Sequence, residues 1–188
     1  MKTVFFKTIF IISILAIGFS SCDKDDPTPE HPQELITTMR LIFTPSLGGN
    51  ETIFEFYDPD GDGGVAPVIQ GGMLEDSTEY NLSIILLDES VSPAEDITAE
   101  IETEGTSHQF FFATTQEFNM TFAYLDEDEN LNPIGLETII NTGPPASGQF
   151  QVTLRHGLNK NALGVRLGDI TNAGGETDIE VAFDLVIE

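Results

Sequence analysis

The feature that most constrains the fold is an alternation of apolar and polar residues that recurs between residues 35 and 188. Side chains with a period of two occupy one face of a β-strand, so each such run predicts a strand with one buried face. Strands of this kind form antiparallel sheets that pack face to face. We therefore expect an all-β protein, an antiparallel β-sandwich of Ig-like or jelly-roll-like type. The alternating residues are Leu35, Thr37, Met39, Leu41 and Phe43; Phe54 and Phe56; Tyr80, Leu82, Ile84 and Leu86; Phe110 and Phe112; Phe118, Met120, Phe122 and Tyr124; Phe150, Val152 and Leu154; Ile179, Val181, Phe183, Leu185 and Ile187.

Two further local patterns refine this expectation. The glycine-containing stretch 45–50 predicts a turn, so the first two strands should form a hairpin. The segment Ser92-Pro93-Ala94-Glu95 has the pattern of a helix start, and Ile97 and Ile101 follow at helical spacing. The sequence therefore predicts one short helix near residues 93–104 that crosses between strands.

The first 21 residues have the pattern of a secretory signal peptide. Lys2 and Lys7 precede an apolar run over residues 9–19, and Ser20 and Ser21 are small residues at a cleavage point. The run is shorter than the roughly 20 residues that a membrane-spanning helix needs.

Cys22, the sole cysteine of the chain, follows these small residues directly. The arrangement resembles the lipobox of bacterial lipoproteins, in which the cysteine thiol receives a diacylglyceryl group and the new amino terminus is acylated. Phe19 stands where that pattern usually has leucine. The alternative is an ordinary cleaved signal that leaves one free thiol. A chain with several acyl groups on Cys22 would stay in a membrane.

Residues 22–33 read as an acidic, proline-rich tether in front of a single domain at 34–188. An aspartate directly after the cysteine favours the inner membrane in enterobacterial lipoproteins. In Bacteroidota, a lysine followed by acidic residues resembles the signal for export to the cell surface, and Lys24-Asp25-Asp26 matches that pattern. We expect a lipid-anchored protein of the outer membrane, exposed at the cell surface.

Charge limits the partners. The chain carries a net charge of −25, and removal of residues 1–21 would take away two lysines and no acidic residue, which leaves −27. A surface this acidic repels phosphate backbones, so we expect no nucleic acid among its partners. It attracts cations and basic partners instead.

Several segments together resemble a family of small flavobacterial (Bacteroidota) surface lipoproteins of unknown function. Members are often labelled as having a type 1 periplasmic binding fold, and some accompany TonB-dependent receptors. A periplasmic binding fold needs two α/β lobes, which this chain does not offer. The resemblance does imply a TonB-dependent receptor as a partner. The segments that carry it are Asp58–Gly64, Ser92–Thr98, His108–Phe111, Asn132–Gly135, Thr153–His156 and Asn172–Val181.

Two acidic loops have the spacing of calcium ligands. Asp58, Asp60 and Asp62 alternate with glycine and proline, although Ile69 stands where an EF-hand has its closing glutamate. The second loop repeats the spacing, with a glutamate at position twelve, but leucine replaces the glycine at position six. The alternative for both is that Asp, Asn and Gly simply favour turns. The predicted ligands of the second loop are Asp126, Asp128, Asn130 and Glu137.

His108 and His156 have the parity of the apolar residues in their strands, one at a strand start and the other at a strand end. If these strands are antiparallel neighbours, both imidazoles lie at the same end of the sandwich. Glu102 and Glu104 would then complete a transition-metal site. The alternative is a pair of hydrogen-bonded histidines without a metal.

Glu176, Asp178 and Glu180 alternate along the last strand, so they should point the same way. This resembles the catalytic strand of jelly-roll glycosidases, but the chain has no tryptophan to stack on sugars. The simpler interpretation is the solvated face of that strand.

We therefore expect a non-enzymatic binding or accessory lipoprotein that assists a TonB-dependent receptor in capturing a nutrient or metal. The alternatives are a structural or adhesive surface module stiffened by calcium and, more remotely, a glycoside hydrolase.

Overall fold

The computed structural model describes residues 34–61, 63–115 and 118–188. The predicted signal peptide, the lipidation of Cys22, the tether and Asp62 therefore lie outside the described residues. No helix among the described residues is both long and apolar enough to cross a membrane.

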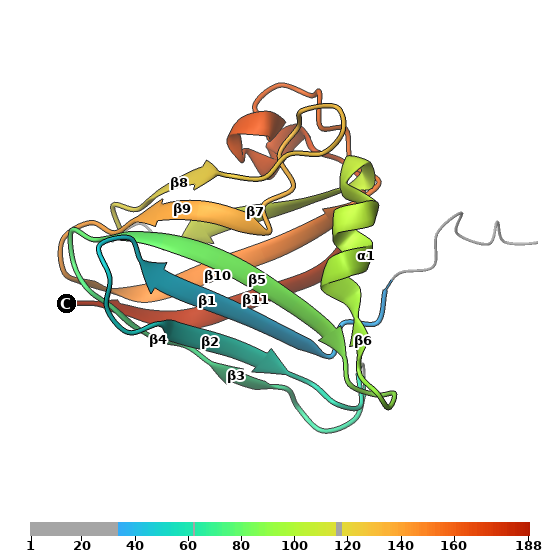
Figure 1. The fold of residues 1–188 in the computed structure, drawn as a ribbon, viewed down its shortest axis with the longest axis horizontal. Coiled ribbons are helices and arrows are strands. Elements are labelled where there is room, and N and C mark those ends of the chain that lie inside the picture. The colour runs from blue at the N-terminus through green and yellow to red at the C-terminus, as the bar shows by residue number, and fades with distance from the viewer. Residues whose placement is uncertain (1–33, 62, 116–117) are drawn as a thin grey trace, which may run out of the picture. The chain divides into compact units, whose positions relative to one another are not determined.

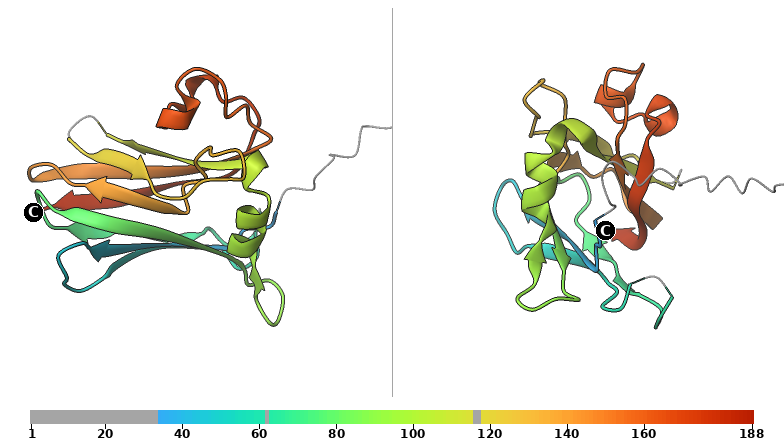
Figure 2. Two further views of the ribbon diagram at one scale, coloured as in Figure 1. Left: turned by 45° about the horizontal axis from the view of Figure 1, so that its top comes forward. Right: turned by 90° about the vertical axis from the view of Figure 1, so that its right-hand side faces the viewer.

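Two sheets make up the domain, and their strands run along a common direction (Figures 1 and 2). One sheet has the strand order β3-β2-β1-β5-β9-β8, with β6 added to β5, and the other has the order β4-β11-β10-β7. The predicted β-sandwich is confirmed. The strands are β1 (Thr38–Pro45), β2 (Thr52–Tyr57), β3 (Val68–Gln70), β4 (Gly72–Leu74), β5 (Glu79–Asp88), β6 (Glu95–Asp96), β7 (His108–Thr114), β8 (Thr121–Tyr124), β9 (Glu137–Asn141), β10 (Ala146–His156) and β11 (Glu176–Ile187).

Pairing is antiparallel except between β4 and β11, which run parallel. The predicted hairpin of β1 and β2 is present, with Met39 opposite Phe56 and Phe43 opposite Thr52. The parallel pair arises because the chain passes from β3 in one sheet to β4 in the other within a single residue, Gly71. A Cβ atom on Gly71 would lie 1.9 Å from the carbonyl oxygen of Asp184, so only glycine fits this crossing.

The core lies between the sheets, and most of its strand residues are those that the alternation identified. Leu35 was placed wrongly, because it precedes β1 and is 49% exposed, whereas Ile36 is buried. Phe43 and Phe54 pack with ring centroids 4.8 Å apart, and Phe150 contacts Phe43 from the other sheet at 6.1 Å. Full burial of each such side chain contributes about 1.5–3 kcal/mol. The largest fully buried side chains are those of Phe43, Phe54, Phe110, Phe150, Phe183, Met39, Leu41, Leu74, Leu82, Leu86, Ile101 and Ile140.

Helix α1 (Ile97–Thr103) covers one end of the sandwich, on the right in Figure 1. The predicted helix is present, but it begins at Ile97 because the Asp96 carboxylate, not Ser92, accepts the capping hydrogen bond from the Ala99 N–H. Ile97 and Ile101 are buried against the core. The 3₁₀ turn η1 (Gly105–Ser107) then leads into β7, so α1 delivers His108 to this end of the sandwich.

Between β10 and β11 the chain makes a long excursion that contains η2 (Val165–Leu167) and η3 (Ile170–Asn172), and Figure 2 shows it standing out from the sheets. Lys160 anchors it. Its buried ammonium donates to the carbonyls of Gly105 and Pro133 and to the carboxylate of Asp128.

Candidate metal centre

The two histidines meet at the end of the sandwich where β7 begins and β10 ends. These strands are antiparallel neighbours, and their register places His156 directly opposite His108. The imidazole rings lie with centroids 4.8 Å apart and planes at 82°. The expectation that strand pairing would bring both rings to one end is confirmed, whereas metal binding there stays a prediction.

A β-bulge brings Asp178 to the same place. In the β10–β11 ladder, Leu154 pairs with Ile179 and Arg155 pairs with Thr177, so Asp178 is an extra residue in β11. An extra residue bends its strand and redirects its side chain. The side chain of Asp178 is only 2% exposed, and its oxygens lie 3.7 Å from His108 Nε2 and 3.9 Å from His156 Nδ1.

Glu34 supplies the fourth group from the segment that precedes β1. Its Oε2 atom lies 3.9 Å from His108 Nε2, and its side chain is 12% exposed. One donor atom from each of Glu34, His108, His156 and Asp178 lies within 4.8 Å of the others. We call this set the histidine–carboxylate cluster.

The expected carboxylates, Glu102 and Glu104, have other positions. Glu104 meets His108 through its backbone carbonyl, which lies 3.2 Å from His108 Nδ1. The side chain of Glu102 lines a separate pocket beside α1. The carboxylates that meet the two imidazoles are therefore those of Glu34 and Asp178, and neither expected glutamate belongs to the cluster.

The contact with Glu104 sets the chemistry of His108. A carbonyl only accepts hydrogen bonds, so Nδ1 carries the proton and Nε2 keeps a lone pair. The ring is fully buried, and burial, the largest cause, lowers its pKa and keeps it neutral. Nε2 has no hydrogen-bond partner among the described residues. A neutral imidazole held by Nδ1–H to a carbonyl, with Nε2 free, is the usual state of a metal-binding histidine.

Asp178 is electrostatically costly without a cation. Burial, as the main cause, raises its pKa to about 6, with the Glu34 and Glu176 carboxylates adding to the shift and His156 and Arg155 opposing it. Glu34 Oε2 is also buried without a hydrogen-bond partner among the described residues. A bound cation would compensate both carboxylates.

The donor spacing fits a small divalent ion. Ligand atoms at about 2.1 Å from a tetrahedral zinc ion lie about 3.4 Å from one another. Three contacts in the cluster measure 3.7–3.9 Å, and one donor atom from each of the four residues lies within 4.8 Å of the others, so side-chain movements of about 1 Å would bring the donors around one ion. Two imidazole nitrogens and two carboxylate oxygens form a donor set that suits zinc and its neighbours better than calcium.

The first acidic loop lies beside this cluster. Asp60 Oδ2 accepts a hydrogen bond from the Val65 N–H, and the Asp58 N–H donates to the Thr37 carbonyl. Asp58 lines a pocket of about 240 Å³ together with Glu34 and Asp178. Calcium binding by this loop stays a prediction, since Asp62 lies outside the described residues.

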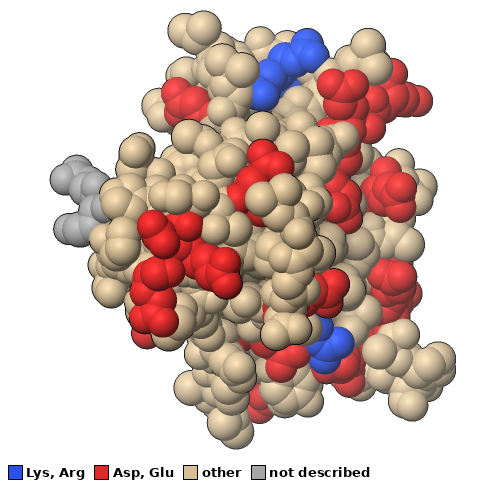
Figure 3. Space-filling model, turned by 60° about the vertical axis from the view of Figure 1, so that its left-hand side comes forward, with Lys and Arg blue, Asp and Glu red and all other residues tan. Residues whose placement is uncertain are grey.

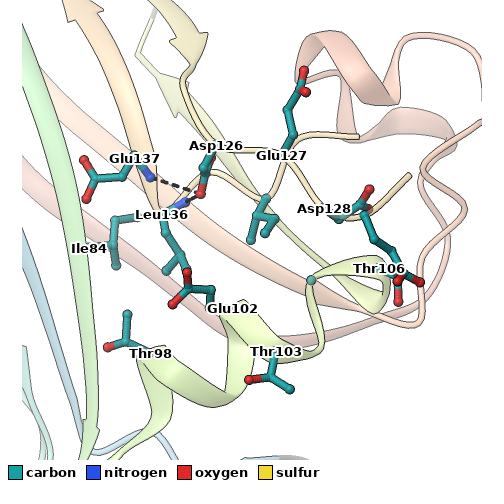
Figure 4. Close-up of a pocket in the computed structure, with 13 residues that line it drawn as sticks. Ile84, Thr98, Glu102, Thr103, Thr106, Asp126, Glu127, Asp128, Leu136 and Glu137 are labelled. Atoms are coloured by element: carbon teal, nitrogen blue, oxygen red, sulfur yellow. Dashed lines mark hydrogen bonds between the residues drawn. The ribbon is translucent and has the colours of Figure 1, made fainter. Parts of the chain in front are cut away.

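The carboxylates of the second acidic loop already have partners in the protein. Asp126 accepts hydrogen bonds from the N–H groups of Gly135, Leu136 and Glu137. Asp128 accepts from two backbone N–H groups and from Lys160. Figure 4 shows the carboxylates of Asp126, Asp128 and Glu137 pointing in different directions, so they do not surround a common centre. Calcium binding by this loop stays a prediction that the geometry does not support. Asn130, the fourth predicted ligand, donates its backbone N–H to Asp128.

The carboxylates of the last strand do not share one face. Asp178 is buried in the cluster, whereas Glu176 and Glu180 are exposed, and Glu180 accepts a hydrogen bond from the Thr153 hydroxyl. The expectation of three aligned carboxylates was wrong because the bulge interrupts the period of two.

No protein-family model, curated protein or solved structure matches the chain. The cluster thus has to be interpreted from its own residues. Sequence reasoning identified both histidines but missed Glu34, for which the sequence carried no signal. It singled out Asp178 as one of three alternating carboxylates, not as a neighbour of the histidines.

Proposed function

We propose that this protein is a non-catalytic binding protein that captures a divalent transition-metal ion, zinc in the first place, at the histidine–carboxylate cluster. The observation that carries the proposal is the fully buried Nε2 atom of His108. It faces two carboxylates and a second imidazole and lacks a hydrogen-bond partner among the described residues. Buried polar atoms of this kind are rare unless a ligand satisfies them.

The net charge of −25 supports cation capture. Figure 3 brings forward the end of the sandwich opposite α1, and there too Asp and Glu side chains are widespread, with few Lys and Arg side chains between them. An acidic field raises the local concentration of cations and speeds their association. The two imidazoles would then favour a transition metal over calcium.

The cellular setting is part of the proposal. Lipidation of Cys22 would hold the domain at the outer membrane, facing the cell surface, where metal ions arrive from outside. A TonB-dependent receptor is the proposed partner that takes over the metal. This partnership is supported by the resemblance of the chain to surface lipoproteins that accompany such receptors.

Calorimetric titration of the detergent-solubilised full chain with Zn²⁺, after removal of metals with a chelator, tests the binding function. We expect one tight site that His108→Gln and His156→Gln each weaken by at least about tenfold. Both variants keep Cys22 and His31, so binding at those residues would persist and be recognised as separate. Wild-type and variant proteins that bind Zn²⁺ equally would refute the proposal.

A further inference from the structure

The pocket beside the cluster contains a carboxylate that the proposed metal site does not yet use. Asp58 stands at the end of β2, where its N–H group donates to the Thr37 carbonyl over 2.7 Å. This bond holds Asp58 beside the segment that begins with Glu34. One pocket is lined by residues 34–36 together with Phe56, Asp58, Gly61, Asp178 and Ile179.

The Oδ1 atom of Asp58 is buried and has no hydrogen-bond partner among the described residues. Neither Lys nor Arg occurs among the described residues that line this pocket or the adjoining one along residues 63–67. A buried carboxylate oxygen without a donor is costly, and the cost is removed when a cation binds it.

A left-handed glycine shapes the turn that follows Asp58. Gly61 adopts a left-handed backbone with φ of +65°, and a Cβ atom there would touch the side chain of Leu35 at 3.4 Å. The turn therefore packs against the segment that carries Glu34. Asp60, by contrast, is exposed and already bonded to Val65 N–H. Two carboxylates of one loop thus differ in their surroundings.

We infer that Asp58 is a fifth ligand of the metal ion at the histidine–carboxylate cluster, rather than the first ligand of a separate calcium loop. Asp58 does not belong to the four residues whose donor atoms lie within 4.8 Å of one another, so its carboxylate would move toward the ion on binding. This inference rests on the proposed metal-binding function and specifies its ligand set as two imidazoles and three carboxylates. The ion would then join the end of β2 in one sheet to β7, β10 and β11 in the other. Five donors suit zinc, cobalt and manganese ions with more than tetrahedral coordination.

The test compares Asp58→Asn with Asp60→Asn in the full chain, because both remove one negative charge from the same loop. Zn²⁺ affinity is measured by competition with a chromophoric chelator, and coordination is followed by the visible absorption of bound Co²⁺, whose intensity rises as the number of ligands falls. We expect Asp58→Asn to weaken Zn²⁺ binding by about tenfold or more and to strengthen the Co²⁺ absorption. Asp60→Asn should change the affinity less than about twofold, as expected for a screened surface charge.

The possible results separate the inference from the function on which it rests. Wild-type protein that binds neither ion would overturn the proposed function. Tight wild-type binding with an unchanged affinity and spectrum in Asp58→Asn would overturn only the role of Asp58, as would equal weakening by both substitutions. Thermal melts in chelator establish that each variant is folded, and Asp58→Ser replaces Asp58→Asn if the latter fails to fold.

Discussion

At the scale of single residues, the cluster shows which side chains a sequence pattern can place and which it cannot. His108 and His156 were placed correctly because both share the parity of buried neighbours in regular strands. Asp178 was placed on the wrong face because one extra residue in β11 reverses the faces to which the side chains before it point. Amino-acid composition gives no reliable sign of such a bulge. Glu34 precedes its strand, so no periodicity applied to it.

Asp178 provides a pH-dependent prediction. Because its pKa is raised from 3.8 to about 6, the folded state holds this proton more tightly than the unfolded state between those values. The ionised carboxylate therefore costs stability above pH 6, by up to about 3 kcal/mol, and the cost is relieved as the pH falls toward 4. We expect Asp178→Asn to raise the free energy of unfolding by about 1–3 kcal/mol at pH 7.5 in chelator, measured by urea denaturation.

The same comparison at pH 4.5 should show most of this gain lost. Asp184→Asn, on the exposed face of the same strand, serves as the matched control and should change stability by less than about 0.5 kcal/mol at either pH. A loss of stability in Asp178→Asn at pH 7.5 without metal would contradict the assignment of Asp178 as a strained, buried carboxylate.

The sequence also provided no indication of the role of Lys160. Its ammonium holds together the loops that contain Gly105, Asp128 and Pro133. Lys160→Met keeps the apolar stem but leaves Asp128 buried without its cation, which should cost about 3 kcal/mol in urea denaturation. Arg166→Met removes an exposed cation from the same excursion and should cost under 1 kcal/mol. Equal losses in the two variants would show that the excursion is not anchored by Lys160.

At the scale of secondary-structure elements, long strands were predictable and short ones were not. β5, β10 and β11 are ten or more residues long, and each contains a run of alternating residues long enough to be recognised. β3 and β4 have three residues each, too few for a period to be recognised. β9 was missed for another reason: Glu137 was interpreted as the closing ligand of a calcium loop, but it begins a strand in which Thr138 and Ile140 are buried.

The passage between β3 and β4 yields a prediction at this scale. Gly71 lies where the chain leaves one sheet for the other, against the backbone of Asp184 in β11. Backbone atoms cannot yield as a flexible side chain does, so Gly71→Ala should separate β4 from β11 and cost about 3 kcal/mol or more. Gln70→Ala, one residue earlier and exposed, should cost less than about 0.5 kcal/mol. Urea denaturation measures the stability of both variants. If Gly71→Ala cost no more than Gln70→Ala, the backbone of Asp184 would not restrict residue 71 to glycine.

At the scale of the whole domain, one core between two sheets accounts for the fold, and the alternation of apolar residues was enough to predict it. The site depended on contacts between distant segments, since residue 34, β7, β10 and β11 meet only in the folded chain. Calcium binding by the acidic loops stays a prediction, because their spacing describes a turn as well as it describes a calcium site. In the second loop, backbone N–H groups and Lys160 donate hydrogen bonds to the carboxylates.

The meeting of these segments predicts how metal should act on the domain as a whole. An ion bound only by the folded state stabilises it by RT ln(1 + [L]/Kd), about 2.7 kcal/mol at a hundredfold excess over Kd. For a domain of this size that corresponds to a rise in Tm of about 5–10 °C. We expect Zn²⁺ to produce this rise in calorimetry of the full chain, and Ca²⁺ at the same concentration to shift Tm by less than about 1 °C.

His108→Gln should abolish the rise in Tm with Zn²⁺. The substitution removes the buried Nε2 atom that would ligate the metal, while the strand pairing of β7 with β10 is kept. Arg40→Gln, a substitution in the outer surface of β1 that breaks only the ion pair with Glu55, should leave it intact. If Ca²⁺ raised Tm as much as Zn²⁺, and this effect survived His108→Gln, the acidic loops would be the stabilising sites. The domain would then be a calcium-stiffened module, because only ligands outside the imidazole pair could hold the ion in that variant.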